Sequence, residues 1–78
     1  MVRKTSIAVR FGGRLRALRL QAGLTQEQLA ESADVSVNFV SLVERGVKSP
    51  TLATMERLAA ALKVPLAELF RFDSGSEN

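Results

Sequence analysis

The sequence predicts a compact all-α domain built from five short helices. Apolar residues recur three or four positions apart along most of the chain, which is the spacing of one buried helix face. Threonine or serine precedes three of these apolar runs as a capping residue, and glycine or proline separates the runs. No stretch of any length alternates as a strand does. The 78 residues suffice for one domain, and because they include no cysteine, apolar helix packing has to hold it together.

The first helix is expected to start near residue 6 and to run to about Ala22, where Gly23 ends it. Gly12 and Gly13 lie inside this helix, although a glycine in a helix interior costs up to about 1 kcal/mol relative to alanine. Close packing of a neighbouring helix would explain one of the two glycines. The buried stripe of the helix is predicted at Phe11, Leu15, Leu18 and Ala22.

Two short helices with a tight turn between them are predicted at residues 25–32 and 36–45. Thr25 and Ser36 cap their first turns, and the turn itself is formed by residues 33–35. This is the pattern of a helix-turn-helix, whose second helix enters the major groove of DNA. The crossing of the two helices is expected to be packed by Ala30, Val35, Val40 and Val43.

Two more helices are expected after this pair. A loop at residues 47–50 leads to a helix that Thr51 caps, and Pro65 suits the first turn of a final short helix at about 65–70. The first of these helices is expected to turn one side inward with Leu52, Met55, Leu58, Ala59 and Leu62. The second is expected to close the core with Leu66, Leu69 and Phe70.

The ends of the chain are predicted to differ from the domain between them. Residues 1–5 are expected to form a flexible basic arm and residues 73–78 a disordered tail, which leaves 6–72 as the domain. The formal net charge is +3, but residues 1–26 contain six lysines and arginines and no acidic residue. A basic end suits a polyanion such as nucleic acid. An ordinary solvated, arginine-rich helix would explain the same charges equally well.

The composition argues against catalysis, metal binding and membrane insertion. The chain has no histidine and no cysteine, so the usual general base, thiol nucleophile and zinc ligands are missing. We therefore expect no enzyme, no cofactor and no metal site. No apolar run approaches the roughly 18 residues of a membrane span, and no signal peptide is visible. We expect a soluble, cytoplasmic protein without an evident small-molecule ligand.

Several segments between Phe11 and Phe70 match a known pattern in order and without gaps. They are Phe11-Gly12-Gly13-Arg14-Leu15-Arg16, Leu18-Arg19, Gly23-Leu24-Thr25-Gln26-Glu27-Gln28-Leu29-Ala30, Val40-Ser41, Val43-Glu44-Arg45-Gly46, Pro50-Thr51-Leu52 and Leu58-Ala59-Ala60-Ala61-Leu62. In these segments the chain resembles the phage-repressor, or XRE-type, helix-turn-helix family, which implies a lambda-repressor-like fold. One departure is Asp34, where the family usually has glycine. Aspartate tolerates a left-handed backbone better than most residues, so we expect a modest cost.

The resemblance also implies which residues hold the DNA backbone. In the family, the glutamine that opens the first helix of the motif grips a phosphate; here it is Gln26, preceded by Thr25. Helix capping alone would also explain these two residues. Arg45 and Lys48 match the family's second set of phosphate contacts, with simple solvated charges as the alternative, and Phe39 matches an aromatic that packs on the sugar-phosphate backbone or on the neighbouring helix. Weaker phosphate candidates are Arg14 and Arg3 or Lys4.

Arg19 and Glu44 match a pair that the family uses inside the fold. The resemblance implies an ion pair that ties the first helix to the recognition helix, and a planar guanidinium holds a carboxylate with two parallel hydrogen bonds. Losing one partner of a partly buried pair costs about 3 kcal/mol or more. We therefore expect a support of the fold and not a DNA contact.

Base reading is expected on the exposed side of the second helix of the motif. Asn38 is the sharpest candidate, because its amide donates one hydrogen bond to an adenine edge and accepts another. Val37 is placed to touch a thymine methyl. Alternatively, Val37, Phe39 and Leu42 form an apolar patch for a protein partner. The predicted base contacts are Ser36, Val37, Asn38, Ser41 and Leu42.

Together these observations predict a sequence-specific regulator of transcription that binds double-stranded DNA. A single small domain offers few base contacts, so a homodimer on a near-palindromic operator is expected. Its small size resembles that of restriction–modification controller proteins and small phage repressors. The alternative is an antitoxin or adaptor whose helix-turn-helix binds a protein. Candidate residues for the dimer surface are Leu66, Leu69, Phe70 and Phe72, and a tail folded back on its own chain is the alternative for Phe72.

Overall fold

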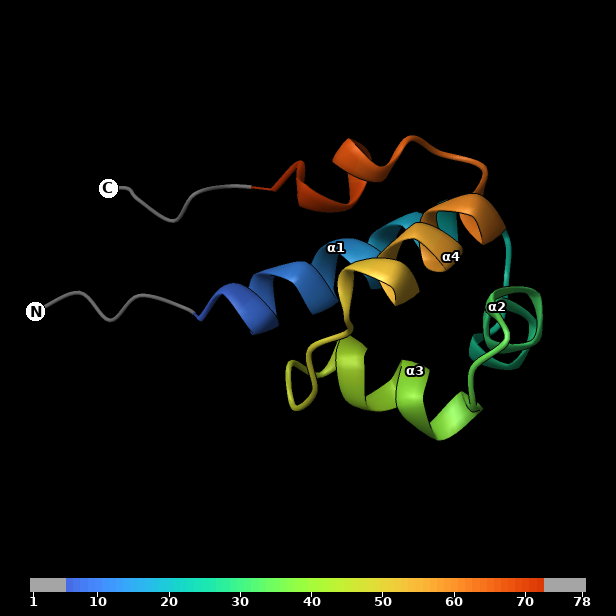
Figure 1. Cartoon of the computed structure of the whole chain (residues 1–78), viewed down its shortest axis with the longest axis horizontal. Coiled ribbons are helices and arrows are strands. Elements are labelled where there is room, and N and C mark those ends of the chain that lie inside the picture. Colours follow the sequence, from blue (N-terminus) through green and yellow to red (C-terminus); the bar gives the residue numbers. More distant parts are fainter. Residues whose placement is uncertain (1–5, 73–78) are drawn as a thin grey trace, which may run out of the picture.

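The computed structural model describes residues 6–72, which form four α-helices and one short 3₁₀ helix (Figure 1). The all-α prediction is confirmed, although the fifth element is a 3₁₀ turn and not an α-helix. No strand occurs among the residues described. The predicted arm at 1–5 and tail at 73–78, including Arg3 and Lys4, lie outside the described residues. The elements are α1 (Ile7–Gln21), α2 (Gln26–Ala33), α3 (Val37–Glu44), α4 (Leu52–Leu62) and η1 (Leu66–Phe70).

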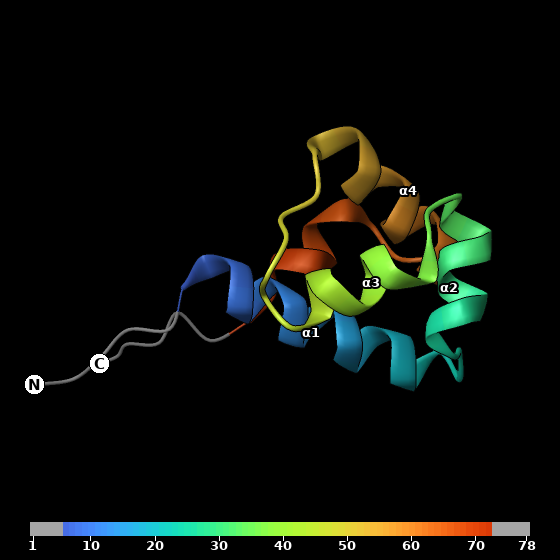
Figure 2. The ribbon, with the colours of Figure 1, turned by 90° about the horizontal axis from the view of Figure 1, so that it is seen from below.

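The helices are arranged around α1, which runs along the length of the molecule. In Figure 1, α3 lies on one side of α1 and η1 on the other, and α1 contacts both. The helix α2 packs on both α3 and α4, and η1 also contacts α4. Figure 2 looks onto α3, with α2 set across its N-terminal end. This arrangement leaves one long side of α3 on the surface.

Helix starts are fixed by side-chain caps. The hydroxyl oxygens of Ser6, Thr25, Ser36 and Thr51 each accept a hydrogen bond from the backbone N–H three residues later, at 3.0–3.2 Å. These bonds satisfy backbone donors that have no partner inside the helix. The predicted starts of all four α-helices are therefore confirmed.

Helix ends use residues in the left-handed backbone region. Gly23 and Gly46 have φ angles of 74° and 78°, which cost glycine little. Asp34 and Lys63 also adopt this region, with φ angles of 59° and 60°. The left-handed backbone at Asp34 is therefore confirmed, and its modest cost stays a prediction. The left-handed backbone at Lys63 was not predicted, because lysine has no special preference for this region.

The core lies where α1, α2, α3 and α4 meet, and η1 covers one edge of it. Its fully buried side chains include Leu15, Leu29, Val40, Val43, Leu58 and Leu69, and Val35 packs against them from the turn. Phe11, Leu18, Ala30, Ala59 and Leu62 are also buried, as predicted.

Four residues expected inside are not buried. Ala22 is exposed because α1 ends at Gln21, and Arg19 takes the buried position in its last turn. Leu52 is 71% exposed at the first position of α4. Leu66 and Phe70 are 37% and 42% exposed, since a five-residue helix on the edge of the core buries only the residue that faces α1 and α4 directly. That residue is Leu69.

One of the two glycines inside α1 is explained by close packing. A Cβ atom on Gly12 would clash with the carbonyl oxygens of Val43 and Glu44 at the end of α3, whereas a Cβ on Gly13 would meet nothing within 4 Å. Gly12 therefore sets how closely α1 approaches α3. The structure gives no packing reason for Gly13.

Candidate nucleic-acid interface

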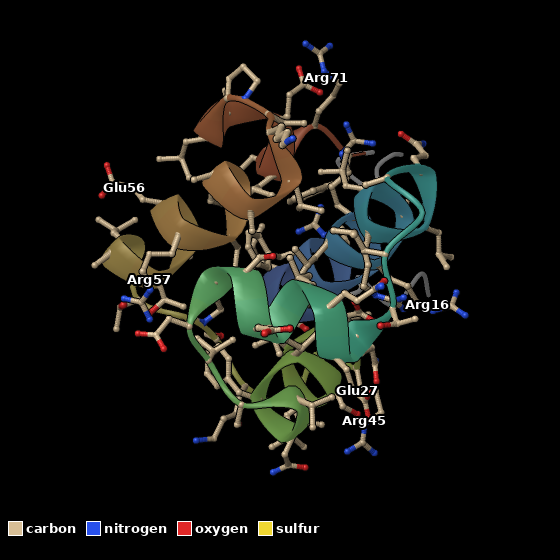
Figure 3. The ribbon with its side chains drawn as sticks, turned by 90° about the vertical axis from the view of Figure 1, so that its right-hand side faces the viewer. Arg16, Glu27, Arg45, Glu56, Arg57 and Arg71 are labelled. Atoms are coloured by element: carbon tan, nitrogen blue, oxygen red, sulfur yellow. The ribbon has the colours of Figure 1, made fainter. Side chains whose placement is uncertain are left out.

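The turn between α2 and α3 is closed by backbone hydrogen bonds and held from a third helix. The N–H groups of Asp34 and Val35 donate to the carbonyls of Glu31 and Ala30, at 3.3 and 3.0 Å. Arg57 reaches from α4 towards the end of α2 (Figure 3), and its Nε donates to the carbonyl of Ala33 at 2.9 Å. The relative orientation of α2 and α3 is therefore fixed by contacts within the fold.

A buried ion pair joins α1 to the end of α3, as predicted. Arg19 Nε donates to Glu44 Oε2 at 2.6 Å and Arg19 Nη2 to Glu44 Oε1 at 3.0 Å, with side chains only 9% and 2% exposed. Arg19 Nη1 donates to the carbonyl of Leu24 at 2.9 Å. The hydrogen bond to Glu44 raises the pKa of Arg19 above its ordinary value, against the opposing effect of desolvation. This pair fixes the recognition helix against α1.

Gln26 and Thr25 are both engaged at the start of α2. Gln26 Nε2 donates to Glu44 Oε1 at 3.0 Å, so this predicted phosphate residue joins the ion pair. Thr25 and Gln28 form a reciprocal capping box, in which each side chain accepts from the other's backbone N–H, at 3.0 and 2.8 Å. The capping role of Thr25 is confirmed, and phosphate contact by Thr25 and Gln26 stays a prediction.

The outer edge of α3 is formed by the predicted base contacts. Ser36, Val37 and Asn38 are exposed, while Ser41 and Leu42 are half-buried beside them. The Ser36 hydroxyl accepts from the N–H of Phe39 at 3.0 Å, so it serves as the helix cap. Asn38 is exposed and forms no side-chain hydrogen bond within residues 6–72, and base contact by its amide stays a prediction. All five residues lie within one helix and its cap.

Phe39 lies against the core, whereas the cations Arg45 and Lys48 lie on the surface after α3. Phe39 is half-buried and packs against the core, which is one of the two roles expected for it. Arg45 caps the C-terminal end of α3 and points outward, below α2 in Figure 3, and Lys48 is exposed in the loop that follows. Both cations therefore follow the C-terminal end of α3.

Arg14 does not belong to this interface. Its Nε donates to the carbonyl of Glu68 at 2.9 Å, and its Nη2 pairs with Glu68 Oε1 at 3.0 Å. The side chain is only 17% exposed, so it ties α1 to η1. The weaker prediction of a phosphate contact by Arg14 is corrected accordingly.

Comparison with known proteins gives the family of this fold. A helix-turn-helix family model matches residues 15–69, which is more than half of the chain. The chain belongs to the phage-repressor, or XRE-type, helix-turn-helix family. Its match extends from the middle of α1 to the end of η1, so it includes the ion pair, both helices of the motif and the core.

Several members of this family are similar to the chain along most of its length. The control protein C.MunI of a Mycoplasma species is 35% identical over 65 residues, which cover 82% of this chain and 88% of that protein. The cryptic phage CTXphi transcriptional repressor RstR of Vibrio cholerae is 41% identical over 59 residues, and the chain spans about half of it, 53%. The crystal structure of the restriction-modification controller protein C.AhdI from Aeromonas hydrophila gives a TM-score of 0.80 at 43% identity, covering 81% of this chain and 96% of that one.

The predicted dimer residues of this helix-turn-helix protein divide into two groups. Leu69 is fully buried in its own protomer, so its side chain cannot contact a partner, and that prediction is wrong. Phe70 packs on Phe11, with ring centroids 5.3 Å apart, and on Phe72, at 6.5 Å. Phe72 also lies under the guanidinium of Arg10 and is half-buried against its own chain. Leu66 and Phe70 remain on the surface.

Sequence reasoning missed an apolar hollow beside the start of α1. Its volume is about 200 Å³, and it lies between the start of α1, the α3–α4 loop and α4. Phe11 lines it and also packs on Phe70, so this buried side chain lies between the hollow and η1. The only sequence signal was the exposed apolar start of α1. The lining residues are Ile7, Ala8, Phe11, Lys48, Ser49, Pro50 and Met55.

Residues 6–72 contain no group of three or more acidic side chains placed to hold a metal ion. In the same part of the chain, no helix combines the length and the apolar character that crossing a membrane requires.

Proposed function

We propose that this protein is a sequence-specific regulator of transcription that binds double-stranded DNA as a homodimer on a near-palindromic operator. The observation that carries this proposal is the exposed polar edge of α3, with Asn38 on its first turn, on a helix fixed by the buried Arg19–Glu44 pair. A recognition helix needs this combination, because base edges are read only by side chains held in a constant orientation. The relatives that are named as repressors and control proteins support the same function.

In the proposed complex, α3 lies in the major groove with its N-terminal edge against the bases. Asn38 donates to and accepts from one adenine, and Val37 meets a thymine methyl. Ser41 and Leu42 lie at the margin of this contact, and Ser36 mainly caps the helix. Phosphates on the two sides of the groove are held by Arg45 and Lys48 at the end of α3 and by Gln26 at the start of α2.

The apolar region around Phe70 is proposed as the dimer surface. Leu66 and Phe70 are exposed, Phe72 extends the aromatic row, and Phe11 connects the row to the hollow. A contiguous apolar region on a small domain marks a contact with another protein. Binding to a near-palindromic operator requires that the second copy holds its recognition helix about 34 Å from the first.

Within this family, the proposed regulator is either a restriction–modification controller or a small phage-type repressor. Relatives of both kinds are similar to the chain, at 35% identity for C.MunI, 43% for C.AhdI and 41% for the CTXphi repressor. No catalytic step, metal or cofactor forms part of the proposal. DNA binding also implies that the protein works in the cytoplasm.

The alternative, an antitoxin or adaptor that binds a protein through α3, has less support. It needs an apolar patch of Val37, Phe39 and Leu42. Phe39 instead packs against the core, and Leu42 is half-buried, which leaves Val37 as the one exposed member, at 41%. A single exposed valine is ordinary on a protein surface.

A DNA titration at several salt concentrations tests the proposal. Random duplex DNA is titrated by fluorescence anisotropy between about 50 and 200 mM salt, where each neutralised phosphate contributes a slope of about −0.9 in log K against log salt. We expect steep salt dependence on random DNA and tighter binding to duplexes selected from a random pool. Binding that does not change with salt, or no binding at any salt, would contradict the proposal and favour a protein partner.

A further inference from the structure

We infer that Glu44 is a positioning residue for DNA binding, because it orients the side-chain amide of Gln26 towards a phosphate. The inference rests on the proposed DNA-binding function and extends the role of Glu44 beyond the ion pair. In the fold, the carboxylate pairs with Arg19. In the DNA complex, it keeps the Gln26 amide oriented towards the phosphate.

The carboxylate of Glu44 accepts hydrogen bonds from two helices at once. Arg19 donates to both of its oxygens, and Gln26 Nε2 donates to Oε1 at 3.0 Å. The Glu44 side chain is 2% exposed, so it cannot turn to another partner without leaving Arg19. The acceptor offered to Gln26 is therefore fixed in space by the ion pair.

This acceptor decides which end of the Gln26 amide faces inward. An ionised carboxylate only accepts, so it binds the NH₂ end of the amide and repels the carbonyl end. The amide is planar, and its second N–H then points at a fixed angle away from Glu44. Gln26 is half-buried and makes no other side-chain hydrogen bond among the described residues. The second N–H is thus available to an anion that approaches the start of α2.

The charge of Glu44 does not oppose this contact. The bidentate bond to Arg19 neutralises the carboxylate before DNA arrives. Gln26 itself is neutral, so it adds a directed donor without releasing a counterion. In this respect it differs from Lys48, which adds charge. The salt dependence of binding therefore separates the two kinds of phosphate contact.

The test is a double-mutant cycle on DNA affinity with Gln26→Leu and Glu44→Gln. We expect each single change to weaken binding to a duplex about tenfold, which corresponds to one hydrogen bond to a charged group. In the Gln26→Leu background, Glu44→Gln should weaken binding less than about twofold. The salt slope should stay unchanged for Gln26→Leu and fall by about one for Lys48→Ala. Glu27→Gln, which removes an exposed carboxylate from the same turn, is the matched control, and its effect should be the same with and without Gln26.

A second readout follows the amide directly. The side-chain NH₂ resonances of Gln26 should show slowed hydrogen exchange in the free wild-type protein and lose this protection in Glu44→Gln. If Glu44→Gln does not fold, Arg19→Met with Glu44→Met replaces the ion pair by apolar side chains, which buried pairs tolerate. In that background, Gln26→Leu should change DNA affinity less than about twofold.

Two results would overturn the inference. Losses from Gln26→Leu and Glu44→Gln that multiply fully would show that the residues act independently. Unchanged or tighter binding by folded Glu44→Gln would show that the amide has to leave Glu44 to reach the DNA. A wild type that binds no duplex would instead overturn the proposed function and this inference with it, so the two failures are distinguishable.

Discussion

The orientation of Asn38 is fixed by buried neighbours on the same helix. Asn38 is exposed, whereas Val40 two residues later is fully buried. Val40 and Val43 fix the helix by its inner face, so the outer face keeps a constant orientation. A flexible asparagine on a loop would offer the same hydrogen bonds but would lose much of their energy in ordering the loop.

Replacing Asn38 with alanine should therefore affect one base pair. We expect a loss of roughly 1–3 kcal/mol in binding to the selected operator and little change on DNA that lacks the matching adenine. Affinities for a set of operators that vary one base pair at a time would measure this. An equal loss on every sequence would show that Asn38 does not read bases.

Asp34 carries strain that glycine would remove. Its backbone is left-handed, with a φ angle of 59°, and the side chain is exposed. Asp34→Gly should raise the free energy of unfolding by up to about 1 kcal/mol in urea denaturation, because the left-handed region disfavours residues with a Cβ. Lys63→Gly, at a φ angle of 60°, is the parallel case at the end of α4. A destabilised Asp34→Gly would mean that the aspartate side chain stabilises the turn.

At the scale of elements, the interface depends on how closely α1 approaches α3. Gly12 allows this approach, and the Arg19–Glu44 pair fixes it about two turns further along α1. Because Glu44 is the last residue of α3, both contacts act on the same end of the recognition helix. The N-terminal end, which carries Asn38, is left for the DNA.

The two glycines of α1 provide a matched test. Gly12→Ala should lower the free energy of unfolding by about 1–3 kcal/mol, since the added methyl group meets the backbone of Val43 and Glu44. Gly13→Ala should raise it by up to about 1 kcal/mol, because the site is open and alanine favours the helix. Thermal unfolding by circular dichroism compares them. Equal shifts in the same direction would contradict the packing role of Gly12.

The short η1 is attached to α1 by charge as well as by Leu69. The hydrogen bond from Arg71, together with the charges of Arg71 and Arg14, holds the pKa of Glu68 below its ordinary value despite desolvation. A lowered folded-state pKa means that Glu68 stabilises the protein above the unfolded pKa of about 4.3. That stabilisation is lost as the pH falls through the folded-state pKa.

Glu68→Gln should therefore reduce the acid sensitivity of the fold. We expect the melting temperature of the wild type to fall more between pH 7 and pH 3 than that of Glu68→Gln. Glu56→Gln, at an exposed position of α4 without an ion pair among the described residues, should keep the wild-type difference. Identical pH profiles for wild type and Glu68→Gln would show that this carboxylate adds nothing to stability.

The helix starts could be predicted from the sequence, whereas the contacts between distant elements could not. Helix starts were predictable because Thr25, Ser36 and Thr51 act on residues three positions away. The contacts of Arg14 with Glu68 and of Arg57 with Ala33 were not, because they join residues 54 and 24 positions apart, and no local pattern records them. For the same reason the hollow, built by three segments, was missed. The pairing of Arg19 with Glu44 was reached only through the family resemblance.

At the scale of the whole molecule, two surfaces have different chemistry. The outer edge of α3 is polar and flanked by cations, whereas the region of Leu66, Phe70 and the hollow is apolar. A dimeric regulator requires both surfaces at once. The proposed base contacts and the exposed residues of η1 are different side chains, so these two contacts can be changed separately. Lys48, a proposed phosphate contact, also lines the hollow and is the one residue that belongs to both regions.

Phe70→Ser should therefore weaken dimer formation while leaving the fold of the protomer intact. Its ring is 42% exposed and packs on Phe11, so we expect a shift towards monomer in analytical ultracentrifugation and weaker operator binding, with helix content retained. Val47→Ser, at a valine 65% exposed on the α3–α4 loop, is the control and should leave the association state unchanged. A Phe70→Ser protein that sediments as the wild type does would place the dimer contact elsewhere.

The most direct test of the central claim is to map the DNA-bound surface by the backbone amide shifts of the labelled protein as duplex DNA is added. The account predicts that the largest changes fall on residues 36–42, with further changes at the start of α2 and at residues 45–48. It predicts little change on η1 and on the parts of the hollow that α1 and α4 supply. Largest changes on η1 and the hollow, with α3 unaffected, would contradict it.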